Sequence, residues 1–166
     1  MAFEATKREW CELYTFFRLL ADGQVHAGNA EGTKDEAMTW PIAMIRREEH
    51  DGTRQYIIEG EEIHICGENM DKRIPREDFD TVAHLVLEAV KASRENDVES
   101  PEGVEEFLDE VAIFDLEAQT DDRTDFYVSF FHKDTPPVGF CVRSKLTSMF
   151  PLLDGGRTAN FKFEQT

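Results

Sequence analysis

The spacing of apolar residues changes along the chain, and this change constrains the fold more than any other feature. Trp10, Leu13, Phe16, Phe17 and Leu20 recur at helical intervals near the N-terminus. Later segments alternate apolar and polar residues, as strands do when their side chains point to opposite faces of a sheet. Both patterns within 166 residues predict a single α/β domain of the α+β type, residues 1–166, with helices flanking a mixed central sheet.

Local signals set the ends of the expected helices. Thr6 and Glu9 have capping-box spacing, and Gly23 stands where a left-handed residue ends a helix. A second helix is expected over residues 78–93, and Ser100-Pro101 predicts the start of a short third one.

The strands are expected mainly on either side of turn residues. His50-Asp51-Gly52-Thr53 predicts a hairpin, because Asp-Gly is a strong turn signal between alternating segments. Residues 26–39 are polar and glycine-bearing, which predicts a loop. The expected strands are 41–46, 54–59, 62–66, 112–118, 126–132, 138–145 and 158–163.

Composition excludes several classes of protein. No apolar run approaches the roughly 18 residues that span a bilayer, and the N-terminus lacks the pattern of a signal peptide. Cys11, Cys66 and Cys141 are odd in number and scattered, which fits reduced thiols and no zinc site. We therefore expect a cytoplasmic protein with no membrane segment.

The charge is strongly acidic but unevenly distributed. The net charge of −17 normally argues against DNA, whose phosphates need Lys and Arg partners. Residues 95–125 hold thirteen Asp or Glu, whereas residues 133–166 hold five cations against three anions. The C-terminal part is the basic part of an acidic chain.

One constellation there has the form of a nuclease site. Asp125 stands at the start of an expected strand, and the next strand would carry Cys141, Arg143 and Lys145 on one face. A carboxylate can hold Mg²⁺, and a neighbouring cation can stabilise charge on a phosphate. On spacing alone, a solvated strand with surface charges explains the same residues.

Longer stretches carry a family resemblance. Ala118–Phe126, Gly139–Ser144 and Leu152–Phe161, together with the helix at Glu12–Gly23, resemble the HpaII family of type II restriction endonucleases. The corresponding family segments read Thr/Ser…Lys-x-Asp-Ile, Gly-Phe-Ser-Ile-Lys-Ser and Leu-Leu-Asn-Ala…Ala-Thr-Asn-Phe. The order and spacing of these segments are more specific than any single one.

The resemblance implies a core of the PD-(D/E)XK kind and Mg²⁺-dependent cutting of double-stranded DNA at CCGG. It also implies a cognate DNA methyltransferase as genetic partner, and it allows a homodimer. Members of the family are longer, so this chain is expected to be the N-terminal and active-site part.

Carried over by position, Asp125 matches the metal-binding aspartate of the family. Arg143 stands at the active-site lysine, and Cys141 at the acid of the motif, which is already a serine in relatives. Arginine keeps the charge but cannot accept a proton. Lys145 could therefore supply the catalytic lysine.

The other expected site residues follow from the same resemblance. Arg157 and Asn160 are candidates for contact with DNA. The cysteine at position 141 leaves one sure carboxylate, so a second metal ligand must come from elsewhere, with Glu117 or Glu110 as candidates.

A second class of function stays open. An acidic interaction protein, or a DNA mimic with a decayed catalytic site, would explain the net charge and the arginine at position 143. Asp125 and the basic C-terminal part oppose this alternative.

Overall fold

The computed structural model describes residues 4–114, 116, 124–131, 136–144 and 146. Its elements, in chain order, are β1 (Glu4–Thr6), α1 (Lys7–Asp22), β2 (Gln24–Gly28), β3 (Lys34–Glu49), β4 (Gly52–Glu59), β5 (Glu62–Gly67), β6 (Met70–Pro75), α2 (Arg76–Ala92), β7 (Asp97–Glu99), α3 (Val104–Glu110), β8 (Phe126–Phe130) and β9 (Val138–Phe140).

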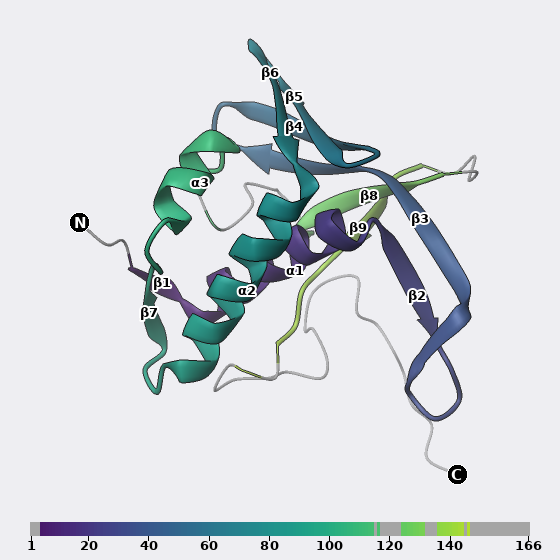
Figure 1. Cartoon of the computed structure of the whole chain (residues 1–166), viewed down its shortest axis with the longest axis horizontal. Helices are drawn as coiled ribbons and strands as arrows, with labels where there is room; N and C mark the ends of the chain where they lie inside the picture. The colour runs from purple at the N-terminus through teal and green to yellow at the C-terminus, as the bar shows by residue number, and fades with distance from the viewer. Residues whose placement is uncertain (1–3, 115, 117–123, 132–135, 145, 147–166) are drawn as a thin grey trace, which may run out of the picture.

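Most strands form one large sheet in the order β6-β5-β4-β3-β8-β9, and β2 pairs with the outer half of β3 (Figure 1). Every pairing within the described residues is antiparallel, including the small β1–β7 pair. The α+β class is therefore confirmed, but the expectation of a mixed sheet is wrong for this part of the chain. Short turns can join antiparallel neighbours such as β3 and β4, whereas β3 and β8 pair from distant parts of the chain.

The helices cover one face of the sheet and form the core with it. Phe16 of α1 packs edge-on against Tyr56 of β4, with ring centroids 4.8 Å apart. Phe17, one residue on, packs against Phe79 of α2 and Phe107 of α3. These rings are buried, so the helical spacing of aromatic residues marks core positions. None of the described helices is long and apolar enough to cross a membrane.

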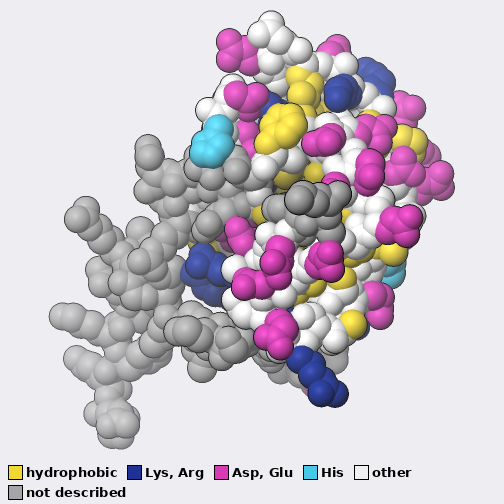
Figure 2. Space-filling view, turned by 90° about the vertical axis from the view of Figure 1, so that its left-hand side faces the viewer, with side chains coloured by type: hydrophobic (Ala, Val, Ile, Leu, Met, Phe, Trp, Pro, Cys, Tyr) yellow, Lys and Arg dark blue, Asp and Glu magenta, His cyan; other side chains and the backbone are white. Residues whose placement is uncertain are grey.

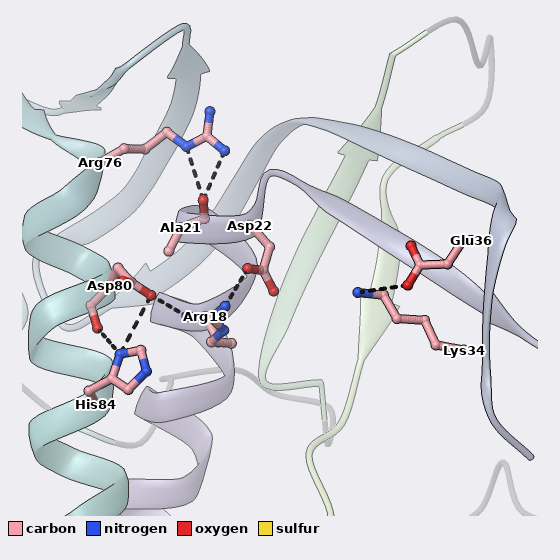
Figure 3. A network of polar contacts seen from close by, with 8 residues as sticks. All are labelled: Arg18, Ala21, Asp22, Lys34, Glu36, Arg76, Asp80 and His84. Atoms are coloured by element: carbon pink, nitrogen blue, oxygen red, sulfur yellow. Dashed lines mark hydrogen bonds and ion pairs between the residues drawn. The ribbon is translucent and has the colours of Figure 1, made fainter.

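Helix α1 ends as its sequence predicts. Thr6 and Glu9 form both bonds of the capping box, and Gly23 adopts the left-handed conformation at φ 70°. Arg76, at the start of α2, donates from Nε and Nη2 to the Ala21 carbonyl, at 3.1 and 2.8 Å (Figure 3). The two helices are thus joined where α1 leaves four carbonyls without helical partners.

The expected loop at 26–39 is largely strand. Residues of β2 pair with the first half of β3 as a two-stranded arm that extends from the body (Figure 1). Asn29 closes the turn, since its side-chain oxygen accepts from the amides of Glu31 and Thr33. Most residues of the arm remain at least partly exposed, so they lack the apolar alternation that signals a half-buried strand.

Two further expectations are corrected. The third helix begins at Val104, and Ser100 instead donates its hydroxyl to the Glu105 carboxylate. Residues 111–114 form no strand: Ala112 has φ 59°, and Ile113 N–H bonds back to Leu108. Their apolar side chains indicated a strand, but burial under the sheet explains most of them. The predicted strand at 158–163 lies outside the described residues.

Gly23→Ala should lower stability more than Gly32→Ala. Both glycines are left-handed, at φ 70° and 79°, which costs another residue roughly 1–2 kcal/mol. A Cβ at Gly23 would also lie 2.8 Å from Arg76 Nη2, whereas one at Gly32 would meet nothing within 4 Å. Urea denaturation of both variants measures the difference, and equal losses would contradict the contact with Arg76.

Candidate active site

Asp125 is held against the segment that follows β9. Its backbone N–H donates to the carbonyl of Phe140, the last residue of β9, at 2.8 Å. Its carboxylate oxygen Oδ2 accepts from the Val142 N–H at 2.6 Å. The side chain is partly exposed. Two bonds to one segment therefore fix the carboxylate at the start of β8, where it can still meet a ligand from solvent.

Arg143 belongs to the same segment. Its side chain is exposed, and Nη1 donates to the Val142 carbonyl at 3.1 Å. Val142 thus contacts Asp125 through its N–H and Arg143 through its carbonyl. The structure brings these two predicted residues together, with the exposed Cys141 beside them.

The strand expected over 138–145 ends at Phe140, so strict alternation does not place these side chains. The carboxylate itself occupies the Val142 N–H, which a longer strand ladder would need. Lys145, Glu117, Arg157 and Asn160 lie outside the described residues. Their roles stay predictions.

Glu110 lies in another part of the molecule. Its backbone carbonyl accepts from Lys72 of β6, and β6 is separated from β8 by β5, β4 and β3. This position does not support Glu110 as a second metal ligand beside Asp125.

Strand register offers a different second carboxylate. Arg46 of β3 and Tyr127 of β8 form the last pair of this ladder, and Glu48 and Asp125 each lie two residues beyond it in the chain. Glu48 is partly exposed, and it accepts the Thr53 hydroxyl bond at 2.7 Å. Sequence reasoning missed Glu48, because only the pairing of two strands far apart in the chain makes them neighbours.

Arg46 places a cation on the same face of β3 as Glu48, two residues earlier in the strand. The Arg46 guanidinium sits 4.4 Å from the centroid of the Tyr127 ring, and its Nε lies 3.5 Å from Glu48. Stacking on Tyr127 and the ion pair hold its charge beside Glu48. This face of β3 and β8 therefore presents acidic and basic groups side by side.

Donor chemistry fits Mg²⁺ better than a transition metal. Mg²⁺ prefers oxygen ligands, and proteins often hold it through one or two carboxylates together with phosphate oxygens of a substrate. Asp125 with Glu48 would supply such carboxylates. Nowhere among the described residues, this site included, are three His, Cys, Asp or Glu side chains arranged to hold a metal ion.

Side chains of the sheet donate hydrogen bonds to backbone carbonyls of residues 110–116, which precede Asp125 in the chain. Lys72 Nζ donates to Glu110 O at 3.1 Å, and the Tyr56 hydroxyl donates to Val111 O at 3.1 Å. Burial raises the pKa of Tyr56, so this hydroxyl stays a donor. Five residues beyond Val111, Arg47 Nη2 donates to Leu116 O at 2.8 Å.

Arg47 is itself part of a buried ionic cluster. It is 1% exposed, it is paired with Glu49, and its Nη2 lies 4.0 Å from a carboxylate oxygen of Glu12. Glu49 and Glu12 are each 5% exposed. Such charges are tolerated inside a protein only when they are paired and hydrogen-bonded.

Arg47→Met should destabilise the protein by about 3–5 kcal/mol, because it leaves buried carboxylates without their cation. Arg73→Met is the control, since Arg73 pairs with Glu59 on the exposed surface of the same sheet, and it should change stability little. Denaturant unfolding measures both. Similar losses in the two variants would show that burial of Arg47 is not decisive.

Surface charge restricts where a polyanion could approach. On the face formed by α3, β1 and β7, Asp and Glu side chains are numerous and Lys and Arg few (Figure 2). This face would repel DNA. The candidate site, where Arg46 and Arg143 lie near Asp125, is a more suitable place for a phosphate.

Comparison with known proteins identifies the class. The sequence matches the HpaII restriction endonuclease family over residues 6–166, and the chain therefore belongs to this family. It is 29% identical over 167 residues to the type II restriction enzyme HpaII of Haemophilus parainfluenzae. The matched region covers 98% of this chain and 46% of that enzyme, so the chain spans about half the length of this relative. No solved structure matches it significantly.

Proposed function

We propose that this chain carries the cutting site of a type II restriction endonuclease of the PD-(D/E)XK kind. The reaction is Mg²⁺-dependent hydrolysis of double-stranded DNA at a short palindrome, CCGG by the family resemblance. One observation carries the proposal: in a chain of this family, the Asp125 carboxylate accepts from the N–H of Val142, the residue directly before Arg143.

The residues divide the chemistry between them. Asp125, oriented by the Val142 N–H, binds the metal ion, and Glu48 is the candidate for a second ligand. When bound, Mg²⁺ activates water and offsets charge that builds up on the phosphate. Arg143 donates to phosphate oxygens, as guanidinium forks do. It cannot accept the proton of the attacking water, so that role falls to Lys145 or to a bound water.

The biological setting follows from the substrate. An enzyme that cuts CCGG endangers its own genome, so a methyltransferase of the same specificity is its genetic partner. A palindromic site suits a homodimer, whose two-fold symmetry matches that of the DNA. We place the reaction in the cytoplasm, where the DNA lies.

Asp125→Asn should abolish Mg²⁺ binding at this site and cleavage with it. The amide keeps the shape of the side chain and can still accept from Val142 N–H, so the melting temperature should stay close to that of the parent. Asp109→Asn, at an exposed position of α3, is the matched control. Calorimetry with Mg²⁺ and cleavage of a CCGG duplex are measured on both. Equal metal affinity in parent and Asp125→Asn would refute the assignment.

The acidic surface favours one competing function, a DNA mimic that occupies a DNA-binding partner. A titration of duplex DNA over a salt series separates the two functions, because a mimic shows no binding and no salt slope. If the chain is a nuclease, replacing Arg143 and Lys145 together by Ala should flatten the slope by two phosphate contacts, roughly 0.9 each. The control replaces Arg8 and Arg73, which are exposed cations elsewhere, and should leave the slope unchanged.

A further inference from the structure

A pocket of about 200 Å³ lies between the two long helices and the segment that follows β9. Tyr14 and Thr15 line it from α1, and Leu87 and Val90 line it from α2. Figure 1 shows α1 and α2 side by side, with the chain after β9 running down from the sheet. The pocket therefore lies on the helical side of the molecule.

The third wall connects the pocket to the candidate active site. Val142, Arg143 and Ser144 line it, and Val142 is the residue whose N–H holds the Asp125 carboxylate. A group in the pocket would thus contact the residue whose N–H holds the carboxylate that we assign to the metal. This continuity makes the pocket part of the same functional region.

The lining has the character of a nucleotide site. Leu87, Val90 and Val142 provide an apolar surface, whereas Thr15 and Ser144 provide hydroxyls. Arg143 lines the pocket, and its guanidinium carries a positive charge that attracts a phosphate. The volume is below the roughly 300–1,000 Å³ of sites for larger ligands, which restricts the occupant to about one base.

We propose that this pocket binds a single deoxynucleotide, with the base against the apolar wall and a phosphate on Arg143. In the setting of the proposed function, the nucleotide is a unit of the bound strand turned out of its stack beside the scissile phosphate. Unstacking a base costs a few kcal/mol, which apolar contact inside a pocket can offset. A free nucleotide has the same chemistry and is the other source.

A fluorescent base reports directly on extrusion. Duplexes that carry 2-aminopurine at successive positions in and beside CCGG are bound at saturating protein, with Ca²⁺ in place of Mg²⁺. Fluorescence at one position should rise several-fold with the parent. Leu87→Trp, which fills the pocket, should abolish the rise. Leu85→Trp is the matched control, since Leu85 is 42% exposed on the same helix and does not line the pocket.

A second measurement titrates deoxynucleoside monophosphates into the same three proteins and follows binding by calorimetry. Binding to the parent and Leu85→Trp, but not to Leu87→Trp, supports the pocket even if no duplex position brightens, and then identifies free nucleotide as the source. If Leu87→Trp does not fold, Thr15→Met fills the pocket from the opposite wall and replaces it in both measurements.

Two results would contradict the proposal that this pocket binds a nucleotide. One is the absence of both a fluorescence rise and mononucleotide binding in a parent that binds duplex; the other is the same response from the parent and the filled variants. The proposed nuclease function survives either result. Conversely, a parent that binds no duplex refutes the nuclease function, and the mononucleotide titration alone then decides whether the pocket is a nucleotide site.

Discussion

A guanidinium buried beneath the sheet holds three parts of the molecule in register. Arg47 connects the end of β3 through Glu49, helix α1 through Glu12, and the segment that leads to β8 through the Leu116 carbonyl. Water cannot replace these partners at a side chain that is 1% exposed. Strand β3, helix α1 and the backbone at Leu116 must therefore be in place together.

The two faces of β3 have different roles: one packs into the core, and the other carries candidate site residues. Arg47 faces the helices, whereas its neighbours Arg46 and Glu48 are partly exposed, because side chains alternate along a strand. The inner face needs complete pairing of charge. The outer face can leave its carboxylates and cations accessible to a metal ion or a phosphate. In a chain whose net charge is −17, these local cations set where a polyanion can bind.

Much of the fold could be predicted from local pattern. Helix α1 has its cap, its apolar stripe and its terminal glycine within eighteen consecutive residues, 6–23, and the hairpin between β3 and β4 has its turn at Asp51-Gly52. The arm formed by β2 and β3 could not be predicted in this way, since it is exposed on both faces. The same holds for the apolar residues 111–113, which are buried in a turn rather than in a strand.

For the site, the sequence by itself determined the residue types: an aspartate before one strand, an arginine after the next, and the order of segments that marks the family. Only the tertiary structure decided how they meet. The Val142 N–H reaches the Asp125 carboxylate because β8 and β9 pair and β9 ends at Phe140, and Arg46 pairs with Tyr127 of β8 from a strand about eighty residues earlier. The physical reason is that no turn joins β3 to β8, so their register is fixed only when the sheet buries one face of each strand.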